Sequence, residues 1–183
     1  SLLLTTVNDI LDLATVDAGI MDLEVDEVDV AVLFASVEQS FAGRFAEAGV
    51  ELKTAVASGI TNFKADGQRL RQVIGNLISN AVNHAPEGSA VNLSAKLDGS
   101  DVVISIQDEG PGIPSDVLAS VFDRFVAHGN GRRRGGAGLG LSIVKGLVEL
   151  HKGSVSIQSN AESGTRVDCR FPADPAKFRQ AAE

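Results

Sequence analysis

The sequence predicts an α+β fold, because long helical segments and short strands follow one another through most of its 183 residues. Apolar residues recur with helical spacing in the segments 29–49, 67–84 and 139–151. Asp66 directly precedes the second of these segments and is a good N-cap residue for it. With 44% hydrophobic residues, the chain can bury a core in one domain, or in one domain plus an appendage. Strands are expected at 50–56, 60–64, 90–97, 101–107, 154–159 and 165–171.

The composition excludes several classes of protein. The net charge of −8 argues against a general nucleic-acid-binding protein, so the arginines at 132–134 form a local basic cluster in an acidic chain. The single cysteine, Cys169, excludes an internal disulfide and a metal site built from cysteines. No apolar run approaches membrane-spanning length and no signal peptide opens the chain, which predicts a soluble protein in a reducing compartment. The chain starts within a helical pattern, and we therefore expect it to be part of a longer protein.

The first unit, residues 1–28, contains an apolar helix that is predicted over residues 2–22. Its apolar side chains need a partner, which is either the rest of the chain or a helix of a coiled-coil or dimeric bundle. The heptad spacing favours the bundle. The acidic run 24–29 interrupts the pattern and is predicted to be a connector. The heptad seam consists of Leu4, Val7, Leu11, Ala14, Ala18 and Met21.

A glycine-rich stretch at 131–145 opens the last predicted helix. Gly136, Gly138 and Gly140 leave no side chain to block a ligand, and the helical periodicity begins at Leu139. A helix N-terminus reached through glycines presents free N–H groups and the positive end of the helix dipole, which suit a phosphate. A flexible loop before a core helix explains the same stretch equally well.

Three asparagines and a histidine share one side of the predicted helix 67–84. Asn76, Asn80, Asn83 and His84 stand at positions i, i+4, i+7 and i+8, beside the apolar stripe that faces the core. Asparagine is unfavourable within helices, so its repetition on one face needs an explanation beyond helix propensity. Amide oxygens can bind a hard cation such as Mg²⁺, which keeps waters and phosphate oxygens as its other ligands. The alternative is a solvated polar edge of the helix.

An acidic residue and glycines follow the strand predicted at 101–107, in the sequence DEGPGIP of residues 108–114. The Asp108 carboxylate can accept a hydrogen bond from the exocyclic amine of adenine, whereas the carbonyl oxygen of guanine would be repelled. A plain turn is the alternative for this motif. A short helix with two phenylalanines, Phe122 and Phe125, is predicted at 118–126.

Together, and in this order, these motifs resemble the catalytic and ATP-binding domain of sensor histidine kinases, which belongs to the GHKL group of nucleotide-binding proteins. The resemblance covers residues 29–172, with 173–183 as a polar tail. Residues 2–22 resemble the second helix of the dimerisation and phosphotransfer bundle. The resemblance implies a Bergerat-type fold, a two-layer α/β sandwich with helices on one face of a mixed sheet and the nucleotide between them. A coiled-coil-like helix would precede it.

The resemblance also implies roles for individual residues. Asn80, with Asn76 nearby, would bind Mg²⁺, and Asp108 would hold the adenine amine. The backbone of residues 138–141 would contact the phosphates, and residues 126–137 would form a mobile lid. The expected nucleotide-binding residues are Asn76, Asn80, Asn83, His84, Asp108, Gly110, Gly112, Ile113, Phe125, Arg134, Gly136, Gly138, Leu139, Gly140, Leu141 and Thr165.

Some positions depart from the family pattern. Asn83 stands where the family usually has lysine, and His84 where it usually has an aromatic ring, so a phosphate contact and a stacking surface change. Ala127 stands where an arginine commonly follows the phenylalanine motif, and one of the arginines 132–134 would have to replace it. Asn76 stands where gyrase- and MutL-type ATPases have a glutamate that activates water. Because an amide cannot take up a proton, steady ATP hydrolysis is not expected.

These implications lead to two hypotheses on function. In the first, the chain is a kinase domain that transfers the γ-phosphoryl group of ATP to a side chain on the upstream bundle, from which it passes to a response regulator. In the second, it is a pseudokinase-like module that binds nucleotide and regulates a response regulator or a partner kinase without efficient transfer. The acceptor residue is expected upstream of Ser1, because none of His84, His128 and His151 is placed as an acceptor.

Both hypotheses share four expectations. The chain would bind ATP or ADP with Mg²⁺, and it would form a homodimer through the upstream helical bundle. It would have no nucleic-acid partner. Its location would be cytoplasmic, either as a free protein or as the cytoplasmic part of a membrane-anchored sensor.

Overall fold

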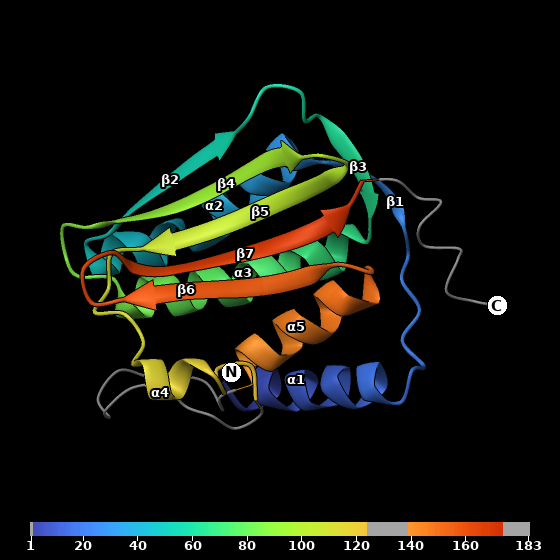
Figure 1. Ribbon diagram of the computed structural model, residues 1–183, viewed down its shortest axis with the longest axis horizontal. Helices are drawn as coiled ribbons and strands as arrows, with labels where there is room; N and C mark the ends of the chain where they lie inside the picture. The colour runs from blue at the N-terminus through green and yellow to red at the C-terminus, as the bar shows by residue number, and fades with distance from the viewer. Residues whose placement is uncertain (1, 124–138, 174–183) are drawn as a thin grey trace.

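The centre of the molecule is a five-stranded mixed sheet, seen in a computed structural model that describes residues 2–123 and 139–173 (Figure 1). The strands follow the order β2-β4-β5-β7-β6. Strand β2 pairs with β4 in parallel, and the other neighbours are antiparallel. This arrangement confirms the predicted α+β class with a mixed sheet. The strands are β2 (Glu51–Val56), β4 (Ala90–Asp98), β5 (Asp101–Asp108), β7 (Gly164–Pro172) and β6 (Ser154–Asn160).

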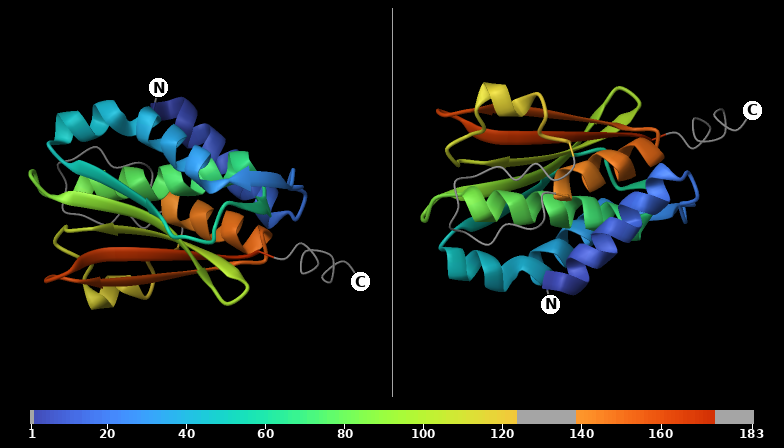
Figure 2. Two further views of the ribbon diagram at one scale, coloured as in Figure 1. Left: turned by 90° about the horizontal axis from the view of Figure 1, so that it is seen from above. Right: turned by 90° about the horizontal axis from the view of Figure 1, so that it is seen from below.

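Helices cover one face of this sheet, which makes the two-layer α/β sandwich that the family resemblance implies (Figure 2). Alternation along the strands separates two environments. The paired residues Ile104 and Cys169 belong to the core beneath the helices, while the next pair, Ser105 and Asp168, lies on the opposite face. The helices of this layer are α2 (Val30–Ala48), α3 (Gly67–His84) and α5 (Gly140–Leu150).

Aspartates cap the first two of these helices. Asp29 Oδ1 accepts a hydrogen bond from the Val32 N–H at 3.0 Å, and Asp66 Oδ1 accepts one from the Arg69 N–H at 3.0 Å. Both bonds satisfy N–H groups that a helix N-terminus leaves without an internal partner. Gly49 ends α2 with a φ of 64°, a conformation that glycine adopts without strain. The prediction that Asp66 caps the helix 67–84 is therefore confirmed.

Helix α1 (Leu2–Asp17) ends at Asp17 rather than at residue 22. The chain leaves the helix at Gly19, whose φ is 65°, and the N–H groups of Gly19 and Ile20 bond to the carbonyl oxygens of Val16 and Thr15. These are the backbone bonds that commonly close a helix C-terminus at a glycine.

One face of α1 packs on the helical layer. Leu13 is buried, and Val16 lies over Gly146 of α5. Packing on its own domain therefore holds for this face. Two members of the predicted heptad seam, Val7 and Leu11, are exposed on α1. The bundle partner of that seam stays a prediction.

Two predictions of local structure are wrong. The acidic run 24–29 is more than a connector, because it contains strand β1 (Asp26–Asp29), which pairs antiparallel with β3 (Asn62–Ala65). Val28, which stands opposite Phe63 in this pairing, is the apolar residue that packs on the core among the acidic ones. The sequence pattern hid this strand because three of its four residues are acidic and exposed.

The second error concerns the helix expected at 118–126. Helix α4 (Ser115–Leu118) ends where that helix was expected to begin, and residues 119–123 form turns. Pro114 precedes α4 with a φ of −56°, which suits a helix start and moves that start toward the N-terminus. Phe125 lies outside the described residues.

The remaining elements agree with their predicted bounds to within a few residues, and helix α3 agrees at both ends. Within 2–123 and 139–173, no helix combines the length and the apolar character needed to cross a membrane. The division of the chain into 1–28, 29–172 and 173–183 stays a prediction.

Candidate nucleotide-binding site

The asparagine stripe of α3 faces the beginning of α5. A Cβ placed on Gly140 would lie 3.9 Å from Asn80 Nδ2, so the two helices approach closely at this point. One turn earlier, Asn76 Nδ2 is buried and has no hydrogen-bond partner among the described residues. A buried N–H donor without an acceptor costs about 1–3 kcal/mol. Such a group is explained when a ligand that the protein binds supplies the missing oxygen.

The buried carboxylate of Asp108 ends strand β5. Its Oδ1 accepts a hydrogen bond from the Gly110 N–H at 2.8 Å. A Cβ on Gly110 would lie 2.8 Å from that oxygen and 2.9 Å from the carbonyl oxygen of His84, so glycine is required here. The motif 108–114 therefore begins with an Asx turn that lies against the end of α3, and its role in binding adenine stays a prediction.

The ionisation of Asp108 reflects this position. Burial raises the pKa of its carboxyl above the ordinary value of 3.8. The backbone N–H groups of Gly110 and Thr165 and the nearby His84 act in the opposite direction. The carboxylate is thus largely removed from water and is held by backbone N–H groups of its own loop and of β7.

Thr165 stands directly opposite Asp108 in the pairing of β5 with β7. Its Oγ1 is 2.7 Å from Ser159 Oγ, which also accepts a hydrogen bond from the Ile113 N–H at 2.7 Å. Ser159 therefore connects two predicted site residues, although the sequence reasoning missed it. The sequence did contain a signal for Ser159. In the alternation along β6, Ser159 falls on the same side as Val155 and Ile157, which pack against the core.

The loop after Asp108 follows a fixed backbone path. Gly112 has a φ of 75°, and a Cβ there would collide with the Asn160 carbonyl oxygen at the end of β6. The Ile113 N–H donates a hydrogen bond to Ser159 Oγ. The loop is therefore held at Ile113 by this bond and at Gly112 by its close packing against β6. The predicted base-pocket residues Gly110, Gly112 and Ile113 are thus brought together beside Asp108.

The beginning of α5 packs its apolar side chains inward. Leu139 is buried, Leu141 packs against the core, and among the described residues no side chain caps the helix. Ser142 Oγ donates to the Leu139 carbonyl oxygen at 2.8 Å, so it is turned away from the N–H groups of the first turn. The predicted residues Phe125, Arg134, Gly136 and Gly138, the lid 126–137 and Ala127 lie outside the described residues.

Asn83 and His84 differ from the other members of the stripe. The Asn83 Oδ1 accepts a hydrogen bond from the Arg44 guanidinium of α2 at 3.0 Å. His84 is exposed, and its carbonyl oxygen lies close to Gly110 of the 108–114 loop. The structure therefore places Asn80 beside Gly140 and Asp108 beside Thr165, and it turns Asn83 toward α2.

The donor set fits magnesium only in part. Among the described residues, no group of three or more His, Cys, Asp or Glu side chains could hold a metal ion. A neutral amide oxygen such as that of Asn80 suits Mg²⁺ when phosphate oxygens and waters complete the octahedron. The residues therefore fit a magnesium ion that arrives with a nucleotide, and not a metal held by protein alone.

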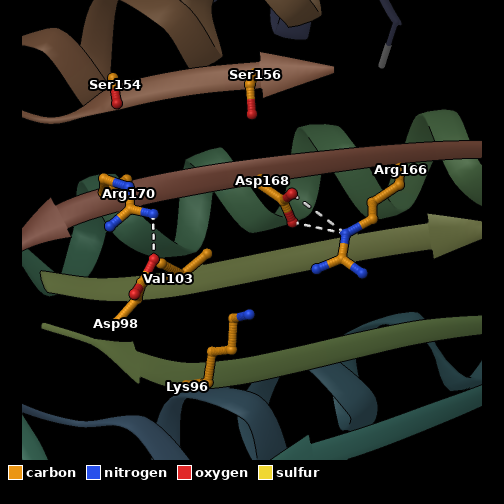
Figure 3. A pocket seen from close by; sticks show the side chains of 8 residues that line it. All are labelled: Lys96, Asp98, Val103, Ser154, Ser156, Arg166, Asp168 and Arg170. Atoms are coloured by element: carbon orange, nitrogen blue, oxygen red, sulfur yellow. Dashed lines mark hydrogen bonds and ion pairs between the residues drawn. The ribbon is translucent and has the colours of Figure 1, made fainter. Parts of the chain in front are cut away.

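A hollow of about 120 Å³ lies on the sheet face opposite the helices (Figure 3). Asp168 accepts hydrogen bonds there from Arg166 at 2.9 Å and from Ser105 at 2.5 Å, and Arg170 pairs with Asp98 at 2.5 Å. None of the predicted site residues lines this hollow. It is a polar surface with three basic and two acidic side chains, separate from the candidate site.

The fold and the site define a class of protein. A two-layer sandwich in which an asparagine-bearing helix, a buried aspartate and a glycine-opened helix meet is an ATP-binding domain of the Bergerat type. The chain belongs to the family of histidine kinase-, DNA gyrase B- and HSP90-like ATPases, whose model matches residues 65–175. Within this family it is a catalytic domain of the sensor histidine kinase type.

Individual relatives support this assignment. The chain is 38% identical to the sensor protein DivL of Caulobacter vibrioides over 167 residues, which cover 91% of this chain and 21% of DivL. It is 37% identical to a sensor-like histidine kinase of Rhizobium meliloti over 185 residues, which cover 99% of this chain and 35% of the relative. The chain thus spans between a fifth and about a third of these curated relatives.

Solved structures agree with the fold. Full-length ShkA in complex with AMPPNP matches with a TM-score of 0.82 and 35% identity, over 93% of this chain and 35% of ShkA. The histidine kinase AdeS of Acinetobacter baumannii matches with a TM-score of 0.78 and 24% identity, over 92% of this chain and 77% of AdeS. The second likeness supports the fold alone. Both confirm the two-layer sandwich that the sequence resemblance implied.

Proposed function

We propose that the chain binds MgATP between α3, the end of β5 and the start of α5, and donates the γ-phosphoryl group in a two-component sensor histidine kinase. The observation that carries this proposal is the buried Asn76 Nδ2, which has no partner among the described residues and lies on the stripe that faces Gly140. A phosphate oxygen or a metal-bound water at this place would supply the missing acceptor. Family membership and the likeness to an AMPPNP complex support the same ligand.

The adenine would lie against Asp108. The carboxylate keeps one oxygen on the Gly110 N–H and offers the other to the exocyclic amine of the base. Thr165, Gly112 and Ile113 would surround the base, because the hydrogen bonds through Ser159 hold them beside Asp108. Guanine would place a carbonyl oxygen against this buried carboxylate, so the site should prefer ATP to GTP.

The phosphates would extend toward Asn80 and the first turn of α5. The backbone N–H groups of the first turn, which no described side chain caps, and the helix dipole favour an anion there. Asn80 would hold Mg²⁺ through its amide oxygen, and the ion would neutralise charge on the phosphoryl group during transfer. Asn76 would donate a hydrogen bond from Nδ2. Neither amide can act as a base toward water, so slow ATP hydrolysis is expected.

A second candidate function follows from Asn83 and His84. Asn83 uses its amide oxygen on Arg44, and the ring of His84 is exposed. Both positions depart from the pattern of active family members, which favours a module that binds nucleotide and regulates a response regulator or a partner kinase without efficient transfer. The phosphoacceptor, the homodimer through an upstream bundle and a cytoplasmic location stay proposals in both cases.

Calorimetry on the 183-residue chain tests the binding proposal. We expect MgATP to bind with micromolar to sub-millimolar affinity, on the order of −5 to −8 kcal/mol, and GTP to bind much more weakly. Asp108→Asn should reduce this preference for ATP. Equal binding of both nucleotides by the wild type would remove the adenine-reading role of Asp108, and no binding at millimolar nucleotide would remove the proposal.

Labelled ATP separates the two candidate functions. A longer protein that includes the upstream bundle should retain protein-bound label if the chain is a kinase domain. Binding of nucleotide without label would identify the regulatory module. The 183-residue chain alone serves as the control, because it should not label itself in either case.

A further inference from the structure

Arg44 extends from α2 to the asparagine stripe of α3. Its guanidinium donates to Ser79 Oγ at 2.8 Å and to Asn83 Oδ1 at 3.0 Å. Its Cζ atom also lies 5.8 Å from the centre of the Phe41 ring. These contacts fix an exposed positive charge beside the stripe, whereas an unrestrained arginine would sample many rotamers in solvent.

The charges of the neighbouring residues indicate why a cation at this position matters. Asn76, Asn80 and Asn83 are neutral, Asp108 is acidic, and the chain as a whole carries a net charge of −8. Because a nucleoside triphosphate carries more negative charge than one Mg²⁺ neutralises, a cation from the protein would favour its binding here. Among the described residues, Arg44 is the cation that hydrogen-bonds to a member of the asparagine stripe.

Arg44 has both the donors and the space to bind a phosphate. A guanidinium carries five N–H groups, and the contacts with Ser79 and Asn83 leave others free. A hollow of about 230 Å³ borders it, lined by Arg44, Glu47, Ala48, Val82 and Asn83. Since one water takes up about 30 Å³ of liquid, this hollow has room for phosphate oxygens together with waters.

We propose that Arg44 is a polyphosphate-binding residue, which contacts the phosphates of the nucleotide from α2, across Asn83. This inference rests on the proposed MgATP binding and adds a third helix to the site. Asn83, one turn beyond Asn80 on α3, then orients the guanidinium toward the phosphates. Glu47 lines the same hollow and limits the gain, because its charge opposes the phosphates.

The test compares nucleotides that differ in phosphate number. Arg44→Gln should weaken MgATP binding about tenfold, as expected for one partly exposed charge-assisted hydrogen bond to phosphate. The affinity for AMP should change by less than about twofold, because the base and the first phosphate keep their contacts. The double variant Arg44→Gln/Asn83→Lys should recover most of the ATP affinity, since the lysine returns a cation from the opposite wall of the hollow.

Arg71→Gln is the matched control. Arg71 also ties α3 to α2, through Ser36, but it lies 12 residues before Asn83 and therefore about 18 Å away along the helix. This variant loses the same charge and a similar contact between helices, and it should bind ATP like the wild type.

The outcomes separate this inference from the proposed function. If the wild type binds ATP and Arg44→Gln binds it equally well, or weakens ATP and AMP alike, the role of Arg44 is overturned and nucleotide binding stands. An equal loss in Arg71→Gln, or no recovery with lysine at position 83, would also overturn it. If the wild type binds no nucleotide, both proposals fall.

Discussion

The backbone N–H of Asp66 donates a hydrogen bond to Nε2 of His151 at 3.1 Å, across 85 residues of sequence. The other ring nitrogen, Nδ1, lies 2.7 Å from the Leu147 carbonyl oxygen, so Nδ1 carries the proton and the buried ring is neutral. The ring also packs edge-on against Phe171. This histidine joins the start of α3 to the end of α5, the two helices that flank the candidate site.

The stability of the fold should fall in mild acid because of His151. Burial lowers its pKa below the ordinary 6.5, so the unfolded chain takes up a proton where the folded chain does not. Above pH 6.5 both states are neutral and the group contributes no pH dependence. As the pH falls from there toward the folded pKa, the free energy of unfolding should decrease by at most about 1.4 kcal/mol per pH unit.

Urea unfolding between about pH 5 and 8 measures this slope. His151→Leu should be less stable overall, because the Asp66 N–H loses its acceptor, but its slope should be smaller than that of the wild type. Equal slopes in His151→Leu and the wild type would contradict the prediction.

Gly164→Ala should destabilise the fold much more than Gly99→Ala. Both glycines have positive φ, 73° and 63°, but a Cβ on Gly164 would collide with the Asp108 carbonyl oxygen, while one on Gly99 meets nothing within 4 Å. Backbone strain alone should cost Gly99→Ala about 1–2 kcal/mol. Overpacking adds to this at Gly164, for a total of about 2–5 kcal/mol.

Urea unfolding compares the two glycine variants. Because the collision displaces Asp108, Gly164→Ala should also weaken ATP binding at temperatures where it is still folded. Equal destabilisation by the two alanines would show that the close approach to Asp108 carries no cost.

Asn76→Leu should stabilise the nucleotide-free protein while it reduces nucleotide binding. Leucine is similar in size, and it removes the buried Nδ2 that has no partner among the described residues. The free energy of unfolding should rise by about 1–2 kcal/mol, and MgATP affinity should fall by about tenfold or more. Thermal unfolding without nucleotide and calorimetry with MgATP measure the two effects. Asn83→Leu is the comparison, because Asn83 has a partner in Arg44 and its replacement should bring no gain in stability.

Asp12→Asn should loosen helix α1 from the domain. Asp12 forms a half-buried ion pair with Arg69 at 3.1 Å and accepts a hydrogen bond from Gln72 at 2.7 Å, and both partners lie on α3. Amide hydrogen exchange in α1 should become about threefold to tenfold faster, with little change in the sheet. Glu51→Gln removes an exposed ion pair with Lys53 elsewhere and should leave α1 unaffected. Unchanged exchange in Asp12→Asn would mean that Leu13 and Val16 alone hold the helix.

Local signals in the sequence predicted most of the helices and strands. Helix α3 was predicted at both ends, because Asp66 caps it and its apolar residues keep a single period. Strand β1 was missed because its acidic residues show no strand pattern by themselves. Its pairing with β3 appears only in the folded structure. Ser159 was missed for a related reason: its importance comes from Ile113 and Thr165, which contact it only in the folded sheet.

By itself, the sequence determined the helix caps, the core-facing periodicity and the order of the asparagine, aspartate and glycine motifs, because each depends on neighbours within a few residues. Only the tertiary structure decided that Asp108 pairs with Thr165 and that Asn83 faces Arg44. It also decided that the buried Asn76 Nδ2 has no partner in the part of the chain that the structure describes. Those outcomes depend on which surfaces pack together and exclude water. No single stretch of the sequence determines how distant segments pack against one another.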